Sequence, residues 1–175
     1  MNKAATVLFL VAGALTLACS TMTTAVDYDH TVNWSQFHTF ALAEGTKDPE
    51  TFTQKRIEDG ITQSLTSKGW TVATSNPDVV VYSHVVLSSE KQWNATSMGG
   101  FGYRGGMGMG GMATATQTNI PIGTIIVDIV NPKTKEMIWR GTAQDQVSGT
   151  GADRGQVQQA MQELFKNFPP GSGKS

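Results

Sequence analysis

The stretch of sequence that decides the fold is Ile-Pro-Ile-Gly-Thr-Ile-Ile-Val-Asp-Ile-Val, residues 120–130, followed by Asn-Pro-Lys-Thr-Lys, residues 131–135. The β-branched residues of the first segment predict a long strand. Pro121 has no N–H to give to a ladder, so we expect it at the start of this strand or on an edge of the sheet. The second segment predicts a tight turn, after which residues 136–143 return as another strand. This is the clearest hairpin in the sequence.

Shorter segments predict the other strands. Residues 79–87 (Val-Val-Val-Tyr-Ser-His-Val-Val-Leu) are the richest β segment, and their apolar start predicts a central strand. Residues 26–32 alternate apolar and polar side chains, as a half-buried strand does. We expect a short strand near Phe40 and a brief one over residues 70–73.

Two segments predict helices. Asp48-Pro49-Glu50 is a helix-start signal, and Gly69 is a natural stop. Between them, apolar residues recur every four positions and make one stripe: Ile57, Ile61 and Leu65. A second stripe precedes Pro169-Pro170, which cannot continue a helix; it consists of Val157, Met161, Leu164 and Phe165. The order of elements predicts a two-layer α+β domain, with an antiparallel or mixed sheet of four to five strands and two helices on one face.

The N-terminus has the pattern of an export signal. Lys3 precedes an uncharged apolar run over residues 4–17, which is too short for a membrane span of about twenty residues. Small Ala18 and then Cys19 follow. We expect residues 1–18 to be a signal peptide, residues 19–25 a tether, residues 26–170 a single folded domain and residues 171–175 a flexible tail.

The segment Leu-Thr-Leu-Ala-Cys, residues 15–19, resembles a lipobox, the site at which bacterial lipoprotein precursors are cut and acylated. It departs from the usual pattern at Thr16, where leucine is preferred. Lipidation of Cys19 would anchor the chain to a membrane by about 0.8 kcal/mol per buried methylene. Ser20 stands where an Asp would signal retention in the inner membrane, so we expect the outer membrane, facing the periplasm. The alternative is an exported protein cut elsewhere, for instance after Ala25.

Composition excludes several classes of protein. The 175 residues carry 13 Lys and Arg against 14 Asp and Glu, which argues against a nucleic-acid partner because phosphate contacts call for a basic excess. A single cysteine excludes an internal disulfide and a cysteine-based metal centre. We expect no cofactor.

Residues 94–118 predict a Gly- and Met-rich loop. Within it, four methionines lie among many glycines: Met98, Met107, Met109 and Met112. A plain flexible loop is one interpretation, an adaptable partner surface is a second, and a Cu(I) site of thioether ligands is a third. The segment lacks the Gly-Lys-Ser/Thr of a phosphate-binding loop.

The titratable residues give no catalytic pattern. His30 and His84 are metal-site candidates if their strands are neighbours, but neither they nor His38 lie at metal-ligand spacing, and ordinary histidines are the simpler interpretation. Asp27 and Asp29, two apart, predict carboxylates on one face. Paired carboxylates can do acid–base work, but a solvated strand face or a structural bond to Arg140 is the favoured interpretation. No nucleophile elbow is present.

The chain resembles a bacterial lipoprotein family named only as domain of unknown function 4136. The resemblance rests on residues 127–134 (Val-Asp-Ile-Val-Asn-Pro-Lys-Thr) with 139–143 (Trp-Arg-Gly-Thr-Ala), and on the order of four weaker marks: residues 26–29, Phe37 with Phe40, residues 69–81 and residues 168–170. A glycine is common in the family between the hairpin strands, where this chain has Lys135. The resemblance implies an exported, often lipidated envelope domain and no known activity.

Two functional hypotheses follow. The first is a non-enzymatic, lipid-anchored envelope lipoprotein that supports the outer membrane or binds an envelope protein. The alternative is a periplasmic protein that binds copper or a small ligand through the Met-rich loop.

Overall fold

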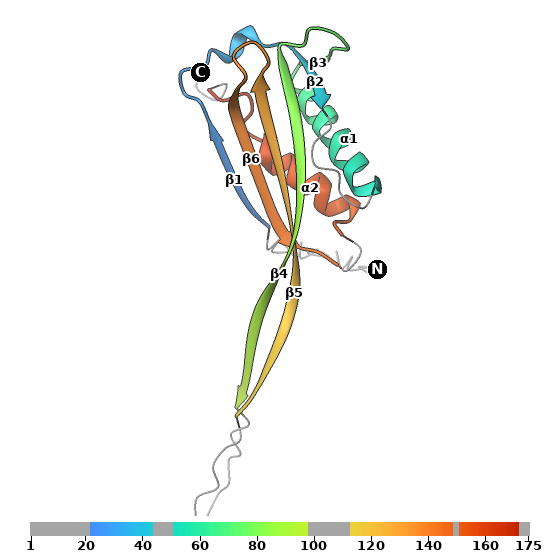
Figure 1. Cartoon of the computed structure of the whole chain (residues 1–175), viewed down its shortest axis with the longest axis vertical. Helices are drawn as coiled ribbons and strands as arrows, with labels where there is room; N and C mark the ends of the chain where they lie inside the picture. Colours follow the sequence, from blue (N-terminus) through green and yellow to red (C-terminus); the bar gives the residue numbers. More distant parts are fainter. Residues whose placement is uncertain (1–21, 44–50, 98–112, 149–150, 172–175) are drawn as a thin grey trace, which may run out of the picture.

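The computed structural model describes residues 22–43, 51–97, 113–148 and 151–171. Its elements are, in chain order, β1 (Thr23–Tyr28), the short 3-10 helix η1 (Trp34–Gln36), β2 (Thr39–Ala43), α1 (Thr51–Ser67), β3 (Thr71–Val72), β4 (Val79–Ser97), β5 (Ala113–Asn131), β6 (Glu136–Gln146) and α2 (Arg154–Phe165). The two helices lie side by side on one face of a sheet, and β4 and β5 continue well beyond it (Figure 1).

The sheet has six strands in the order β1-β6-β5-β4-β2-β3, so the expectation of four to five strands was wrong. It is mixed, because β2 runs parallel to both β3 and β4 while the other neighbours are antiparallel. The brief strand expected over residues 70–73 is found as β3. Only two residues long, β3 is held to β2 by backbone bonds such as that from the Thr71 N–H to the His38 carbonyl, at 2.9 Å, and side-chain periodicity does not register them.

The helices cover the face that their apolar stripes predict. Ile57, Ile61 and Leu65 of α1 are fully buried, and each such side chain contributes about 1.5–3 kcal/mol by leaving water. The stripe of α2 is buried as well. Asp153 begins α2 with a capping box, in which its carboxylate accepts from the Gln156 N–H at 2.9 Å.

One end of the core is aromatic. Phe168, which is 2% exposed, lies within 5.7 Å, ring centre to ring centre, of four other rings: Trp34, Trp70, Trp139 and Phe165. These rings come from η1, from the residue before β3, from β6 and from α2. The segment after α2 therefore closes the domain, and aromatic pairs of this kind add about 0.5–1.5 kcal/mol each.

The hairpin of β4 and β5 extends beyond all its neighbours. The partners of β4 and β5 run without a shift from Val80–Val130 to Ser97–Ala113, whereas β6 accompanies β5 only as far as Ile122. We call residues 88–97 together with residues 113–121 the arm. The loop predicted over residues 94–118 is corrected accordingly, because residues 94–97 and 113–118 are strands; residues 98–112 lie outside the described residues.

Pro121 lies within β5, at the root of the arm, rather than at the start of the strand. It is opposite Ser89 of β4, and its carbonyl accepts the Val147 N–H at 3.0 Å on the other side. In an extended strand the N–H and C=O of one residue point to the same side, so the proline nitrogen points away from β4. The β4·β5 ladder thus loses no donor. The expectation of a strand start or a sheet edge was wrong, because β5 is an interior strand and Pro121 lies within it, where β6 ends.

The turn between β5 and β6 requires one unusual backbone conformation. Lys135 has a φ of +64°, in the left-handed region that glycine adopts without cost, and its N–H donates to the Asn131 carbonyl at 2.7 Å. Lys133, in the same turn, has no positive φ. The chain keeps a lysine in a place where the backbone favours glycine.

We predict that Lys135→Gly raises the free energy of unfolding by about 0.5–1 kcal/mol, because it removes the steric cost of a positive φ. Lys133→Gly is the matched control and is expected to lower stability slightly, since it only adds freedom to the unfolded chain. Urea denaturation of both variants measures the difference. Equal effects of the two substitutions would contradict the turn geometry.

Candidate functional site

Two features of the described chain are candidates for function: a polar cluster on the sheet face opposite the helices, and the arm. The cluster centres on Asp128 of β5, whose residue is 7% exposed. Neighbouring residues on a strand point to opposite faces, so Val127 and Ile129 enter the core under the helices while Asp128 points the other way. A carboxylate in such a place requires partners.

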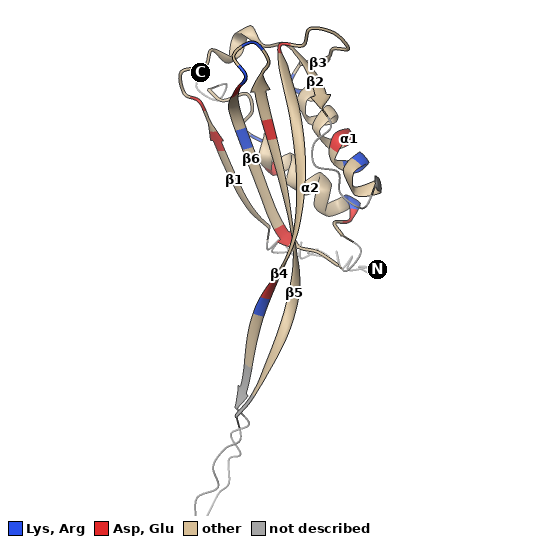
Figure 2. Ribbon diagram, viewed as in Figure 1, with Lys and Arg blue, Asp and Glu red and all other residues tan. Residues whose placement is uncertain are grey.

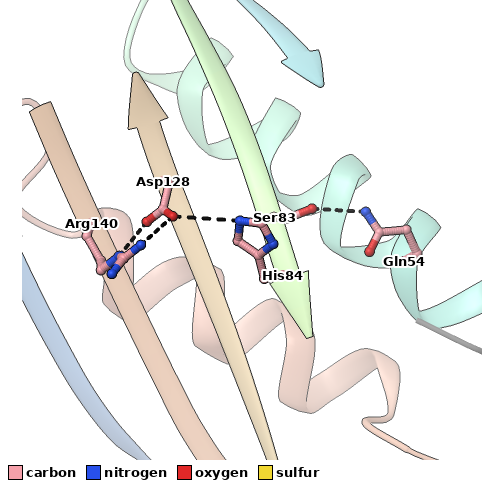
Figure 3. A network of polar contacts seen from close by, with 5 residues as sticks. All are labelled: Gln54, Ser83, His84, Asp128 and Arg140. Carbon is pink, nitrogen blue, oxygen red and sulfur yellow. Dashed lines mark hydrogen bonds and ion pairs between the residues drawn. The ribbon is translucent and has the colours of Figure 1, made fainter. Parts of the chain in front are cut away.

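Asp128 receives those partners from the strands on either side of it (Figure 3). Arg140 of β6 lies directly opposite in register, and its Nε and Nη2 donate to the two carboxylate oxygens at 2.6 and 2.7 Å. The Nε2 atom of His84, on β4, lies 3.7 Å from Oδ2. The hydrogen bond to Asp128 raises the pKa of the Arg140 guanidinium above its ordinary value, outweighing the opposite effect of burial. The arrangement is a bidentate ion pair between β5 and β6, with His84 of β4 beside it.

The neighbour of His84 connects the same strand to the helical layer. Ser83 points to the opposite face and accepts from the Gln54 Nε2 atom of α1 at 2.9 Å (Figure 3). The same Gln54 nitrogen donates to Glu58 at 2.9 Å. β4 therefore carries polar side chains to both of its faces at one level, and each side chain contacts a partner from a neighbouring element. The Gln54 Oε1 atom is buried without a hydrogen-bond partner.

Arg140 was expected to have a structural role, and its ion pair confirms that role with a different acid. Asp27 of β1 also lies opposite Arg140 in register, but in the described structure the Arg140 bonds go to Asp128. The Asp27 carboxylate instead accepts from the Tyr28 N–H at 2.9 Å. Asp128 was missed although the signal was available: it is a lone charge in an apolar strand, facing the strand that returns from the hairpin turn.

The expected pairing of Asp27 with Asp29 does not form. Asp29 lies past the end of β1, and its carboxylate accepts from the hydroxyl and the N–H of Thr31, at 2.7 and 2.8 Å. These bonds lower the pKa of Asp29 below its ordinary value, the hydroxyl bond contributing most. The carboxylate stabilises a turn.

The three histidines lie apart. His30 follows β1 at one end of the strand order, and β6 and β5 separate it from His84 on β4. His30 contacts the ring of Tyr28, with ring centres 4.3 Å apart. The backbone N–H of His38 donates to Asp78 at 3.0 Å; this bond lowers the pKa of Asp78 the most, followed by that of the Thr39 hydroxyl. The idea of a metal site between neighbouring histidine strands is wrong.

Other candidate ligands are limited by what the structure describes. Within residues 22–43, 51–97, 113–148 and 151–171, no three His, Cys, Asp or Glu side chains gather as a metal site. Cys19 and the four methionines of the copper hypothesis (Met98, Met107, Met109 and Met112) lie outside the described residues. A groove of about 490 Å³ runs between α1 and α2, with Arg56 and Arg154 in its lining. In the described part of the chain, no helix is long and apolar enough to cross a membrane.

The arm is the second candidate feature. It projects by ten residues of β4, about 30 Å at the rise of a strand. The charges near it are Glu90 and Lys91, both close to the root, and the described part beyond them is uncharged (Figure 2). Trp93 is 67% exposed on it. The arm exposes two unpaired strand edges and a large aromatic side chain beyond the rest of the domain.

The sequence matches a known family along almost the whole domain. The model of a domain of unknown function, DUF4136, matches residues 24–170. The chain belongs to the DUF4136 family. No curated protein matches its sequence.

Two solved structures share the fold of this DUF4136 domain. A PDZ domain protein from Parabacteroides distasonis has a TM-score of 0.54 and 16% identity, over 85% of this chain and 35% of that protein, so this chain spans about a third of its length. A PelC dodecamer variant from Paraburkholderia phytofirmans has a TM-score of 0.50 and 8% identity, over 82% of this chain and 94% of that one. At these identities both show a common fold alone.

We predict that Asp128→Asn lowers the free energy of unfolding by about 2 kcal/mol, because it replaces the charged, bidentate acceptor of Arg140 at a buried position. Asp27→Asn is the matched control: the same change, opposite the same arginine, at an exposed carboxylate, with an expected effect within about 0.5 kcal/mol. Urea denaturation near neutral pH measures both. The assignment of the ion pair is wrong if the two variants lose equal stability.

Proposed function

We propose that this DUF4136 domain is a non-enzymatic lipoprotein of the bacterial cell envelope, anchored by acyl chains on Cys19 to the outer membrane on its periplasmic side, and that it binds a partner through the arm. The observation that carries the binding role is the arm itself. A hairpin that extends beyond its sheet exposes unpaired backbone donors and acceptors along both edges. Adding a strand to such an edge is a recurrent mode of protein recognition.

The placement of the first described residues supports this arrangement. Met22 packs against the core, and with Val85 and Leu87 it lines the small cavity at the root of the arm. Cys19 is three residues earlier, which is about 10 Å of extended chain. Under this proposal, the membrane anchor and the arm share one end of the sheet, so the arm extends from the side of the domain that is held closest to the membrane.

The polar cluster supports the non-enzymatic part of the proposal. Among the described residues, Asp128 is the one charged residue that is buried. Its oxygens accept hydrogen bonds from Arg140, and one lies 3.7 Å from His84. Its position across three strands suits a role in fixing the register of the sheet from which the arm projects. A carboxylate engaged in this way has no free oxygen directed at a substrate.

The anchor is tested by the mass of the mature protein from membranes. We predict an N-terminus at Cys19 carrying acyl chains, and release of Cys19→Ser from the membrane fraction. An unmodified N-terminus at another residue, for instance after Ala25, would overturn the anchoring.

The binding role is tested by photo-crosslinking in cells. A photoreactive amino acid at Trp93, on the arm, is expected to give a discrete crosslinked species. The same amino acid at Phe52 of α1 is the control, since that side chain is 77% exposed but lies on the helical layer. Crosslinking at Phe52 but not at Trp93 would show that the binding surface is elsewhere.

A further inference from the structure

We infer that the partner of the arm is a second copy of this chain, and that two copies join by pairing the outer edges of their β5 strands, antiparallel and centred on Thr116. This inference rests on the proposed partner-binding function and identifies the partner. It is argued from the direction of the backbone groups, from the protection of each edge and from the symmetry of the sequence along β5.

The direction of the backbone groups follows from Pro121. Its carbonyl points away from β4, to the Val147 N–H, and the β4·β5 register is continuous from there to Ala113. Because backbone groups alternate sides along a strand, those of Ala115, Gln117 and Asn119 also point outward. Those of Thr116 and Thr118 point to their partners in β4, and the ladder of the arm does not use the outward groups.

Each edge of the arm is protected only at its root. Natural proteins block exposed strand edges with charges, prolines or bulges. The β4 edge carries Glu90 and Lys91. The β5 edge reads Ala-Thr-Ala-Thr-Gln-Thr-Asn over residues 113–119, with no charge, no proline and no glycine, and its only blocking residue is Pro121 at the root. Beyond these root residues both edges are open, since residues 92–97 of β4 (Gln-Trp-Asn-Ala-Thr-Ser) also lack charge, proline and glycine. The choice of the β5 edge therefore rests on the symmetry of its sequence.

The sequence of the β5 edge is self-complementary in an antiparallel pair. Antiparallel pairing about a twofold axis at Thr116 places Thr116 opposite its own copy and Ala115 opposite Gln117. It also places residue 113 opposite residue 119. All outward-facing residues then fall on hydrogen-bonded pairs, and the two Thr116 residues form the closer, non-hydrogen-bonded pair, with Cα atoms about 4.5 Å apart. Threonines at 114, 116 and 118 map onto one another under this axis, and Thr–Thr pairs favour pairing of strands.

Pairing also relieves a weakness of the arm. A two-stranded hairpin in water is marginally stable by itself, whereas two arms joined along β5 make a four-stranded sheet. The interface is isologous, so it closes as a dimer. The pairing forms between untethered copies, and tethering both to one membrane raises their effective concentration and strengthens it.

A single-cysteine experiment tests this geometry in the full chain. Cys19→Ser removes the natural thiol, and Thr116→Cys then places one thiol at the twofold axis, where the expected Cα separation suits a disulfide. Asn94→Cys is the matched control, because Asn94 lies directly opposite Thr116 within the arm and is exposed on the other strand. We expect disulfide-linked dimer to form about tenfold faster with the thiol at 116 than with the thiol at 94.

A second substitution separates edge pairing from chance collision. Gln117→Pro removes an outward N–H and leaves the β4·β5 ladder intact, and Pro121 shows that the same edge accepts proline. Combined with Thr116→Cys, it is expected to reduce dimer formation to the rate of the control, with an unchanged midpoint of urea unfolding. Equal rates at 116 and 94, or no effect of Gln117→Pro at an unchanged midpoint, would overturn the inference.

The outcome is distinguishable from that of the proposed function. If Trp93 crosslinks a different envelope protein while the thiol at 116 gives no dimer, the binding role stands and the self-pairing falls. If the dimer forms in the soluble Cys19→Ser chain while the mature protein proves unacylated, the self-pairing stands and the membrane anchoring falls.

Discussion

The backbone ladder between β4 and β5 is the constraint on which the rest of the structure depends. It joins 18 consecutive residue pairs without a shift, and the other elements cover only its proximal part. On that part, β2 and β6 add strands at the sides and the helices cover one face. The distal part has no such neighbours among the described residues, so the same hydrogen bonds that build the core of the sheet also extend the arm beyond it.

The two faces of the sheet contribute to the fold in different ways. Under the helices, complete burial of Ile57, Ile61 and Leu65 supplies the hydrophobic driving force, and the rings around Phe168 close the end of the core. On the opposite face, the Asp128–Arg140 ion pair crosses from β5 to β6. Because a one-residue slip would bring Asp128 into the apolar core, this pair penalises wrong registers between β6 and β5, the strand that continues into the arm.

The sequence was informative where side-chain pattern determines structure and uninformative where the backbone does. The helix stripes, the stop at Gly69 and the hairpin of residues 120–143 were predictable from periodicity and turn chemistry. The arm was not predictable in this way, because its Thr, Asn, Gln and Ala residues bury no apolar face and therefore have the composition of a loop. The strand count was too low, although the brief strand over residues 70–73 was expected and is β3. The acid that pairs with Arg140 could not be predicted from the strand register either, because Asp27 and Asp128 both lie opposite Arg140.

The central claim is that the arm is an ordered, self-pairing strand edge, and residue-specific amide hydrogen exchange at several protein concentrations tests it most directly. The account predicts that the amides of Thr116 and Thr118, which face β4, are protected at every concentration. It predicts that the outward amides of Ala115, Gln117 and Asn119 gain protection as the concentration rises, because they become bonded in the dimer. Exchange of all five amides at the rate of an unstructured peptide, at every concentration, would contradict it.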